Sequence, residues 1–272
     1  MPHVPTISLN DGHSIPQLGF GVYQVPAAEA RGVVGTALEA GYRSIDTATI
    51  YRNEEGVGQA IRDSAIDRNE IFLATKLWND DQGYDSALRA FDASLGRLGL
   101  DHVDLYLIHW PQPSRDRYRD SWRALEKIKA DGRARSIGVS NFTVAHLERL
   151  LGDHGVVPSL NQIELHPGLP QDELVRFHRE HNIVTEAWSP LAQGDLDNSV
   201  VRELAAKHSR TPAQVVLRWH MQRGVVAIPK SATPSRIREN IDVFDFGLDD
   251  DDMRAIATLN TGKRLGPDPE RF

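Results

Sequence analysis

The sequence contains no cysteine among its 272 residues. Disulfide bonds, thiolate nucleophiles and cysteine-based zinc sites are therefore excluded, although the cellular compartment stays open on this criterion. The opening segment, MPHVPTISLNDG, lacks a basic stretch followed by an apolar one, so we expect no secretory signal. No apolar run approaches the roughly 18 residues of a membrane-spanning helix. These absences favour a cytoplasmic protein that does not enter the membrane.

Positive charge is scarce relative to negative charge. The chain carries 31 lysines and arginines against 38 aspartates and glutamates, which gives a formal net charge of −7. This balance argues against nonspecific binding of nucleic acid, but it allows a local basic pocket for one phosphate group. Hydrophobic residues make up 40% of the chain and charged residues 25%, which is the composition of a globular protein.

Most of the chain alternates between segments typical of β-strands and segments typical of α-helices. Strands are expected over residues 19–22, 42–46, 70–76, 102–109, 134–140, 157–165, 183–190 and 224–231. Helices are expected over 28–42, 54–64, 85–100, 118–132, 144–155, 171–182, 200–209, 211–224 and 235–244. Apolar strands alternating with helices indicate a parallel sheet, and eight such units in one domain favour a closed (β/α)8 TIM barrel, an α/β fold.

Both ends of the chain fall outside this alternation. The segment ISLNDGHSIPQ is typical of a hairpin with Asp11 and Gly12 at its turn. The acidic residues 249–252 precede MRAIATLN and predict the N-cap and first turn of a last helix. No linker or low-complexity segment interrupts the pattern. We therefore expect a single barrel domain over residues 1–272, with an N-terminal β-hairpin and a polar tail over one face.

Four polar residues stand at or just after expected strand ends. They are Asp46 and Tyr51 in YRSIDTATIYRNEEGVG, Lys76 in EIFLATKLWND, and His109 in VDLYLIHWPQP. All strands of a parallel barrel open on one face at their carboxyl ends, so these four side chains could meet in one pocket.

The four residue types suit proton donation to a carbonyl group. The ordinary pKa of tyrosine is about 10, and a neighbouring cation would make the proton of Tyr51 easier to release. Lys76 is expected to be that cation, with Asp46 keeping it charged and in place. His109 would hydrogen-bond a substrate carbonyl and orient it. The set predicts delivery of a proton to a carbonyl oxygen while a hydride reaches the carbon.

Each of the four residues alone also fits a structural role. Asp46 could cap a helix, and Tyr51 could be an aromatic residue at the barrel rim. Lys76 could be a solvated strand end, and His109 a satisfied histidine. Their order after consecutive strands favours one shared catalytic role over four independent structural ones.

The motifs lie within longer segments that resemble the aldo-keto reductases. The resemblance covers nearly the whole chain and is strongest to the bacterial branch containing 2,5-diketo-D-gluconic acid reductases. The segments are GYRSIDTATIYRNEEGVG, LATKLWND, DLYLIHWP, RSIGVSNF, NQIELHP and VVAIPKSATPSRIRENIDVFDF. It implies that Tyr51 is the proton donor, Asp46 and Lys76 its activating pair, and His109 the carbonyl-orienting residue. It also implies a monomeric, NADPH-dependent enzyme that reduces small aldehydes, ketones, dicarbonyls or keto-sugars to alcohols.

The sequence lacks a Rossmann fingerprint for the cofactor. Its nearest imitation is the GVG at 56–58, but Ile61 occupies the third small position and the segment falls in a helix. Lys230 and Ser231 stand, with Pro229, at the end of the last expected strand, and Arg236 lies in the first turns of the next helix. Two cations, a hydroxyl and helix amides suit the 2′-phosphate of NADP(H), although a solvated basic helix start is the alternative.

The resemblance implies further contacts to the cofactor. From the nicotinamide outward, they are Ser140, Asn141 and Gln162 on the carboxamide, Trp188 on the ring, Ser189, Leu191 and Gln193 along the pyrophosphate, and Glu239 and Asn240 at the adenine.

Aromatic residues near the strand ends are expected to wall the substrate site. Tyr23, Trp78 and Trp110 would exclude water around His109, although ordinary packing is the alternative reading. The segment SPLAQGDLDNSVVREL and the tail after Asn260 are short, which predicts an open pocket.

Two other function classes compete with a reductase. A redox-sensing protein that holds the nicotinamide cofactor with little turnover is disfavoured by the intact set of four residues. A metal-dependent barrel hydrolase would need ligand spacing that the histidines do not show, so we expect no metal, and we take His166 as structural. The expected partners are therefore a cofactor and a small carbonyl substrate, with no nucleic acid and no membrane.

Overall fold

The computed structural model, which describes residues 4–153 and 155–272, contains a two-stranded hairpin and an eight-stranded parallel sheet. The hairpin strands are β1 (Thr6–Ser8) and β2 (Ser14–Pro16). The sheet strands, in spatial order, are β3 (Phe20–Gly21), β4 (Ser44–Asp46), β5 (Phe72–Leu77), β6 (Val103–Ile108), β7 (Ala134–Ser140), β8 (Leu160–Glu164), β9 (Val184–Trp188) and β10 (Val226–Ala227).

The first and last strands of this sheet meet and close it into a barrel. Leu18, just before β3, forms a parallel bridge with Ala227 of β10. The amide of Gly19 donates to the carbonyl of Ala227 at 2.9 Å, and that of Gly21 donates to the carbonyl of Pro229 at 3.1 Å. The expectation of a (β/α)8 barrel with an N-terminal hairpin is confirmed.

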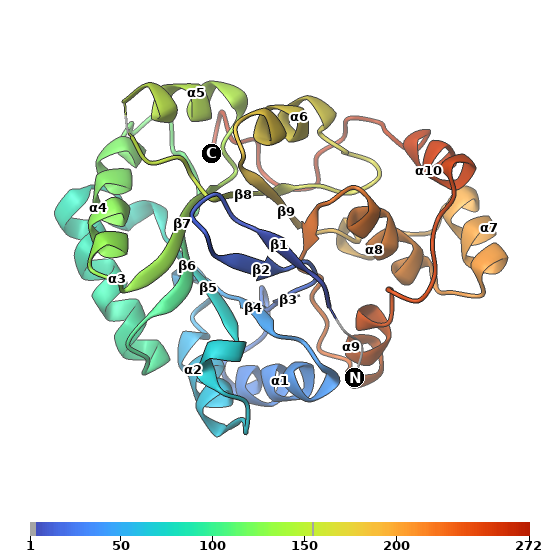
Figure 1. The fold of residues 1–272 in the computed structure, drawn as a ribbon, viewed down its shortest axis with the longest axis horizontal. Helices are drawn as coiled ribbons and strands as arrows, with labels where there is room; N and C mark the ends of the chain where they lie inside the picture. The colour runs from blue at the N-terminus through green and yellow to red at the C-terminus, as the bar shows by residue number, and fades with distance from the viewer. Residues whose placement is uncertain (1–3, 154) are drawn as a thin grey trace.

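Helices surround the barrel on its outside, and the hairpin lies across one of its ends (Figure 1). The helices are α1 (Ala27–Ala40), α2 (Glu54–Asp63), α3 (Tyr84–Leu98), α4 (Tyr118–Ala130), α5 (Val144–Asp153), α6 (Asp172–Glu180), α7 (Ser199–His208), α8 (Pro212–Gln222), α9 (Pro234–Ile241) and α10 (Asp250–Ala257). We call the covered end the hairpin end, and the opposite end, where the strands finish, the carboxyl end.

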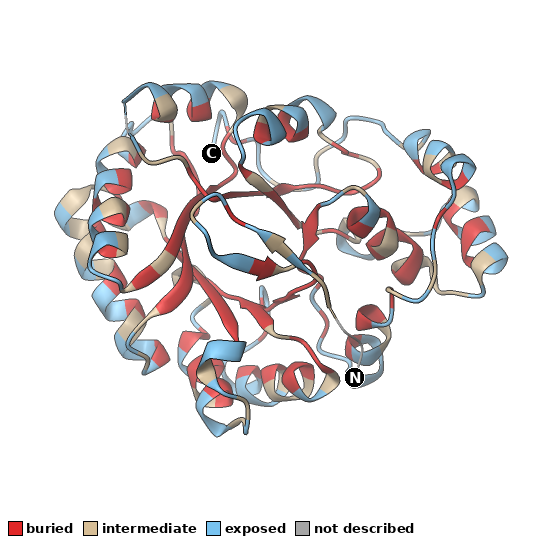
Figure 2. Cartoon of the chain, in the orientation of Figure 1, coloured by how far each residue is buried: buried red, intermediate tan, exposed pale blue. Residues whose placement is uncertain are grey.

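The strands are buried on both faces, which explains their nearly continuous apolar character (Figure 2). A small cluster of hydrophobic side chains fills the inside of the barrel near the hairpin end, and Ile15 of β2 covers it. Its other buried members are Leu9, Phe72, Ala74, Leu105, Leu107, Leu160 and Val226. Since side chains alternate along a strand, Lys76, Gln162 and Glu186 point to the same inner side, two residues beyond Ala74, Leu160 and Val184. The barrel interior therefore changes from apolar to polar toward the carboxyl end.

The glycines at 56–58 serve helix packing. Gly58 lies on α2 where that helix meets the end of α3, and a Cβ there would stand only 1.9 Å from the carbonyl oxygen of Leu98. Such a distance would force the two helices apart. The absence of a side chain is thus explained by the contact between α2 and α3, and the segment lies in a helix as expected.

Helix ends follow the sequence signals. Gly41 ends α1 with φ at 110°, a left-handed conformation that glycine adopts without strain. Asp249 caps α10, since its carboxylate accepts from the amide of Asp252 at 2.9 Å. The acidic segment 249–252 therefore has the capping role that its position predicts.

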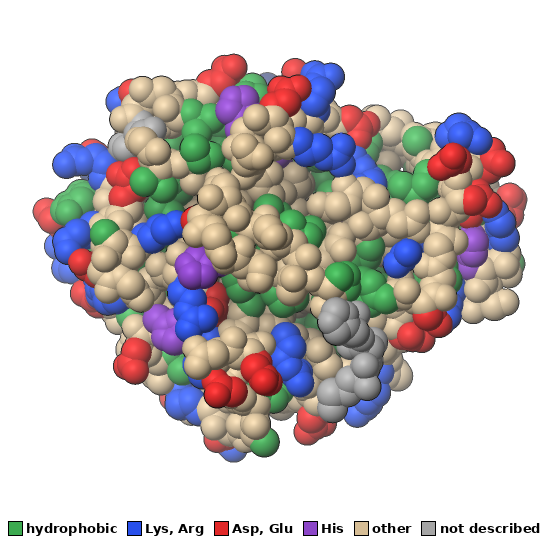
Figure 3. All heavy atoms as spheres, viewed as in Figure 1, with side chains coloured by type: hydrophobic (Ala, Val, Ile, Leu, Met, Phe, Trp, Pro, Cys, Tyr) green, Lys and Arg blue, Asp and Glu red, His purple; other side chains and the backbone are tan. Residues whose placement is uncertain are grey.

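Acidic and basic side chains are interspersed over the face that carries the hairpin (Figure 3). Mixed charge of this kind forms no extended basic surface in that view. Across the described part of the chain, no helix combines the length and the apolar character that crossing a membrane requires.

Candidate active site

The four residues singled out in the sequence meet at the carboxyl end of the barrel. Asp46 is the last residue of β4, and Tyr51 ends a short 3-10 turn, Thr49–Tyr51, just beyond it. Lys76 lies inside β5, one residue before its end, and His109 directly follows β6. The Lys76 ammonium lies 5.2 Å from the centre of the Tyr51 ring, and the rings of Tyr51 and His109 are 5.8 Å apart.

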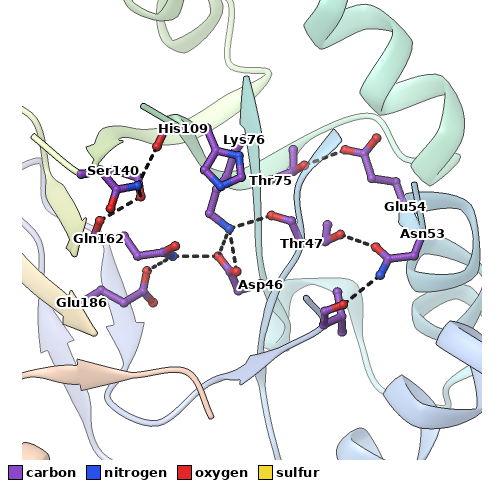
Figure 4. A network of polar contacts seen from close by, with 12 residues as sticks. Asp46, Thr47, Asn53, Glu54, Thr75, Lys76, His109, Ser140, Gln162 and Glu186 are labelled. Atoms are coloured by element: carbon purple, nitrogen blue, oxygen red, sulfur yellow. Dashed lines mark hydrogen bonds and ion pairs between the residues drawn. The ribbon is translucent and has the colours of Figure 1, made fainter. Parts of the chain in front are cut away.

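Asp46 and Lys76 form a fully buried ion pair (Figure 4). The Lys76 ammonium donates to both carboxylate oxygens of Asp46, at 2.7 and 2.6 Å, and to the backbone carbonyl of Thr47 at 2.9 Å. All three donors of Lys76 are thus used. The inner oxygen of Asp46 also accepts from the side-chain amide of Gln162 at 2.9 Å. Complete pairing offsets the cost of removing both charges from water.

The turn that carries Tyr51 is fixed by Asn53, which the sequence analysis did not single out. Asn53 is 1% exposed. Its amide nitrogen donates to the carbonyls of Val22 and Val25 at 2.9 and 3.1 Å, and its oxygen accepts from the hydroxyl of Thr47 at 2.8 Å. The turn is therefore tied to the loop after β3 and to the residue whose carbonyl holds Lys76. The Asn-Glu pair after Tyr51 was a possible signal.

A second buried carboxylate fixes the beginning of α2 against β5. Glu54 accepts from the hydroxyl of Thr75 at 2.6 Å (Figure 4), and its other oxygen accepts from the guanidinium of Arg97 at 2.7 Å. Thr75 precedes Lys76 on β5, and its side chain points to the outer side of the barrel. The helix after Tyr51 and the strand that carries Lys76 are therefore held in a fixed relation.

The surroundings of Tyr51 affect its acidity. Burial raises the pKa of Tyr51 well above its ordinary value, and the negative charge of Asp46 raises it further. The expectation that Lys76 makes this proton easier to release stays a prediction. Within the described residues, the Tyr51 hydroxyl has no hydrogen-bond partner. Tyr51 is therefore protonated at neutral pH and free to donate.

His109 is a neutral imidazole. Burial and the nearby charge of Lys76 hold its pKa well below the ordinary value. Its Nδ1 is buried and has no hydrogen-bond partner in the part of the chain that the structure describes. A neutral imidazole carries one N–H donor, so His109 has the chemistry needed to hydrogen-bond a carbonyl oxygen.

The residues expected around a nicotinamide are already bonded to one another. The hydroxyl of Ser140 donates to the carbonyl of Gln162 at 2.8 Å. The side-chain nitrogen of Asn141 donates to the carbonyl of His109 at 2.9 Å, and its oxygen accepts from the indole of Trp188 at 2.8 Å. The amide nitrogen of Gln162 donates to Asp46 and, at 2.7 Å, to Glu186. Both N–H groups of Gln162 are thus used, and its amide oxygen is left as an acceptor.

The loop after β9 has an unusual backbone. Ser189, Ala192 and Gln193 have φ values of 48°, 48° and 56°, which are uncommon for residues other than glycine. His220 of α8 is hydrogen-bonded to the carbonyl of Pro190 at 3.0 Å. Ser189, Leu191 and Gln193 therefore lie on a strained, anchored loop at the carboxyl end.

The basic residues after β10 are exposed. Lys230 and Arg236 are both exposed, and neither has a charged or hydrogen-bonded partner among the described residues. Ser231 is 9% exposed, and its hydroxyl accepts from the amide of Thr233 at 3.1 Å. Two free cations at the beginning of α9 are suited to a phosphate group.

The two residues expected at an adenine lie further along α9. Glu239 is partly exposed and already accepts from the hydroxyl of Thr211 at 2.7 Å. Asn240 is 5% exposed. The contact of these two residues with an adenine stays a prediction.

Aromatic rings surround Tyr51 and His109. Tyr23 lies 5.1 Å from the Tyr51 ring, and Trp78 lies 5.3 Å from the His109 ring, between ring centres. Trp110 lies 6.5 Å from Trp188. The sequence analysis missed Phe272, whose ring is 4.6 Å from Trp110 and 6.4 Å from Trp78. The tail is short, yet it contributes to this aromatic wall.

The tail is held to the barrel by Glu164 at the end of β8. Its carboxylate accepts from the amides of Leu265 and Gly266, at 2.6 and 3.1 Å, and contacts His166 Nε2 at 3.1 Å. A Cβ on Gly266 would lie 2.4 Å from the Trp188 ring, so the backbone runs directly against that indole. His166 lies within this contact, in agreement with its expected structural role.

Metal ligands are not assembled at this site. Within the described ranges, no group of three or more histidine, aspartate or glutamate side chains could hold a metal ion. The donor and acceptor groups at the carboxyl end instead suit an organic cofactor and a carbonyl compound.

Comparison with known proteins identifies close relatives. The family model described as the aldo/keto reductase family matches residues 17–261. An aldo-keto reductase of Mycolicibacterium smegmatis is 56% identical over 269 residues, which is 98% of each chain. The methylglyoxal reductase DkgA of Yersinia pestis is 54% identical over 98% of this chain and 97% of its own.

Solved structures agree with this likeness. The crystal structure of a Gox0644 variant in complex with NADPH superposes with a TM-score of 0.96 and 51% sequence identity, covering 99% of each chain. The aldo/keto reductase from Brucella melitensis has a TM-score of 0.94 and 59% identity over 96% of this chain and 99% of its own.

Proposed function

The chain belongs to the aldo/keto reductase family and is an NADP(H)-dependent oxidoreductase that acts on carbonyl groups, and we propose that Tyr51 donates the proton in this reaction. The observation that carries the proposal is the Tyr51 hydroxyl, which makes no hydrogen bond within the described residues and lies beside the buried, fully paired Asp46–Lys76 ion pair. A protonated group with no competing partner among the described residues is suited to give its proton to a bound substrate.

The residues at the carboxyl end fit the cofactor. Lys230 and Arg236 offer exposed, unpaired cations to the 2′-phosphate, within the described chain. Gln162 offers its amide oxygen to the carboxamide, since both of its N–H groups are used. Trp188 would stack on the nicotinamide ring, and Ser140 and Asn141 would complete the carboxamide contacts. When bound, NADPH supplies the hydride that reduces the carbonyl carbon.

The remaining cofactor contacts follow the same surface. Ser189, Leu191 and Gln193 would line the pyrophosphate along the loop after β9. Ser231 would assist the phosphate contact, and Glu239 and Asn240 would face the adenine. Arg236, as a planar guanidinium, suits two parallel hydrogen bonds to a phosphate.

His109 and Tyr51 both act on the carbonyl oxygen, His109 through a hydrogen bond and Tyr51 through its proton. The neutral imidazole of His109 donates a hydrogen bond that orients the oxygen without adding charge. As the carbonyl is reduced, its oxygen becomes more basic, and Tyr51 gives it the proton that balances the hydride. The high pKa of Tyr51 keeps that proton in place until the oxygen becomes basic enough to take it.

The aromatic wall supports a small, uncharged carbonyl compound as substrate. Tyr23 packs against Tyr51 and Trp78 packs against His109, and together with Trp110 they would exclude water from the reacting group. Dicarbonyls such as methylglyoxal are favoured by the similarity to methylglyoxal reductase DkgA, and aldehydes, ketones and keto-sugars fit the same site. The proposal includes one barrel domain over 1–272, a monomeric state and a cytoplasmic location, where NADPH is the common reductant.

The proposal is tested by the change Tyr51→Phe, which removes only the hydroxyl. Consumption of NADPH, followed by its absorbance, is measured with a panel of small aldehydes and dicarbonyls. Turnover should fall by about 10²–10⁴-fold, the usual contribution of a positioned acid. Folding should not change, because the hydroxyl makes no hydrogen bond within the described residues.

Tyr23→Phe is the matched control, since that ring packs against Tyr51 and is 57% exposed. It should retain most of the turnover. Equal losses in the two variants, or full activity of Tyr51→Phe with normal NADPH binding, would show that Tyr51 does not donate the proton.

A further inference from the structure

Glu186 is a buried acid in the barrel interior that the mechanism above does not use. It lies in the middle of β9 and is 1% exposed. In the sheet register it stands beside Gln162 of β8 on one side and Val226 of β10 on the other. A glutamate is rarely buried so completely unless it is paired. The charge on this carboxyl group therefore matters to whatever lies around it.

Glu186 is linked to the catalytic residues through one side chain. The amide nitrogen of Gln162 donates to the Glu186 carboxyl at 2.7 Å and to Asp46 at 2.9 Å (Figure 4). Asp46 in turn holds Lys76. Two hydrogen bonds from one amide thus connect Glu186 with the ion pair beside Tyr51.

The balance of charge around Glu186 is set by its neighbours on three strands. Asp46 on β4 carries a negative charge, Lys76 on β5 carries a positive charge, and Gln162 on β8 is neutral. The first two cancel, so an ionised Glu186 would leave one uncompensated negative charge inside the barrel. Burial and the charge of Asp46 raise the pKa of Glu186 to about 8, although Gln162 and Lys76 act in the opposite direction. The carboxyl group is therefore neutral at pH 7.

The effect of this charge reaches Tyr51. A negative charge on Glu186 makes the Tyr51 proton harder to remove, in the same direction as Asp46 does. Below pH 8 the neutral carboxyl adds no such charge. Above it, Glu186 ionises and Tyr51 becomes a weaker acid.

We propose that Glu186 is a positioning residue whose proton sets the acid strength of Tyr51, so that its ionisation marks the alkaline limit of efficient reduction. The inference rests on the proposed role of Tyr51. In each reduction a hydride goes from the nicotinamide to the carbonyl carbon, the O–H bond of Tyr51 breaks, and its proton goes to the carbonyl oxygen. Solvent then returns a proton to Tyr51. The Glu186 proton is not transferred in this cycle.

The two reaction directions should respond with opposite signs. Reduction needs a protonated, sufficiently strong Tyr51 and should slow when Glu186 ionises. Oxidation of the alcohol needs Tyr51 without its proton, and an ionised Glu186 delays that state to higher pH. Removing the charge should therefore preserve reduction just above pH 8 and bring the onset of oxidation to lower pH.

The test is the pH dependence of kcat for both directions, with the intact enzyme and the change Glu186→Gln. Glutamine keeps the shape and an oxygen that accepts from Gln162, but it does not ionise. The wild-type rate of reduction should decline in a step near pH 8, and the variant should lack that step. Oxidation by the variant should begin at a lower pH than in the wild type, because glutamine cannot carry the negative charge that raises the pKa of Tyr51.

Glu186→Asp is the conservative comparison, since it retains a carboxyl group that titrates. It should keep an alkaline step, whereas a purely structural role would impair the aspartate and glutamine variants alike. If the profiles of Glu186→Gln and wild type superimpose, or if both variants lose the step, the inference is wrong.

A direct titration of the wild type guards against variants that fail to fold. Infrared difference spectra should show a buried carboxyl group that loses its proton near pH 8, and a carboxylate already ionised at neutral pH would overturn the inference. Tyr51→Phe, measured in parallel, separates the two proposals. Turnover in that variant would overturn the role of Tyr51, whereas an inactive Tyr51→Phe with an unchanged Glu186→Gln profile would overturn only the role of Glu186.

Discussion

At the hairpin end of the barrel, Asp104 is held by two guanidinium groups, whereas at the carboxyl end Asp46 is held by one lysine. Asp104 accepts from the amide of Leu73 at 2.9 Å and pairs with Arg68 at 2.8 Å and Arg135 at 3.2 Å. The exposed fractions of its two arginine side chains are 19% and 34%. The Asp46–Lys76 pair is sealed, with side chains 4% and 0% exposed.

The difference lies in what surrounds each carboxylate. Arginines stay charged at every accessible pH, so the Asp104 group works as a fixed clamp between strands. Around Asp46, the hydroxyl of Tyr51, the imidazole of His109 and the carboxyl group of Glu186 are all titratable groups. A carboxylate paired with a cation therefore joins strands at the hairpin end, whereas at the carboxyl end it lies beside the groups for which we propose a role in proton transfer.

Empty volume does not distinguish the two ends in the same way. A cavity of about 370 Å³ lies at the hairpin end, where it is lined by Gly12, His13, Asp104 and Arg135 together with residues of the neighbouring loops. Asp104 and Arg135 in this lining are already paired with each other. The cavity therefore lies beside the Asp104 group, at the opposite end of the barrel from Tyr51 and His109.

The largest effect on stability is expected from Lys76→Met. It would leave the carboxylate of Asp46 buried without its cation, which costs about 3–5 kcal/mol of unfolding free energy. Turnover should be lost as well. Urea denaturation and NADPH consumption measure the two effects.

The double change Asp46→Asn with Lys76→Met is the control for this prediction. It removes both charges together, so most of the stability should return while the enzyme stays inactive. If the single variant were as stable as the double variant, a buried Asp46 carboxylate without its cation would not cost the stability that we predict.

A smaller loss is expected at the hairpin end. Asp104→Asn keeps the shape but leaves Arg68 and Arg135 without their counter-charge, and their partial exposure to water softens the penalty to about 1–3 kcal/mol. The reaction occurs at the opposite end, so kcat and KM should stay within about twofold. A change in kcat as large as that of Tyr51→Phe would show that the two ends are not independent.

The sequence was sufficient to predict the barrel and the meeting of the four polar residues. Each strand carries an apolar run with helical segments around it, and parallel strands place Asp46, Lys76 and His109 at one end of the barrel. The resemblance to a known family supplied the expected cofactor contacts, and their roles stay predictions.

Other features of the site depended on the register of the sheet and on long-range contacts. Glu186 lies in VTEAW, a segment whose sequence predicts a strand but not which strand it pairs with. Only the register of β9 against β8 places Glu186 beside Gln162. The contact of Phe272 with Trp110 joins the chain end to the strand-end loops. The use of all three donors of Lys76 by Asp46 and Thr47 likewise depends on contacts that the sequence does not reveal.

The smallest expected effect concerns two arginines, one without a partner at the carboxyl end and one paired at the hairpin end. Arg236 is exposed and has no partner within the described chain, whereas Arg135 is tied to Asp104 and to Asn69. Arg236→Ala should weaken NADPH binding about tenfold, or about 1.4 kcal/mol, because a charge-assisted contact to the 2′-phosphate is lost. NADH lacks that phosphate, so its affinity should not change.

Arg135→Ala is the comparison at the hairpin end. It should lower the urea midpoint of unfolding and leave the affinities for NADPH and NADH unchanged. Titration of protein fluorescence with each cofactor measures the affinities, and equal weakening of NADPH and NADH binding in Arg236→Ala would remove this residue from the phosphate site.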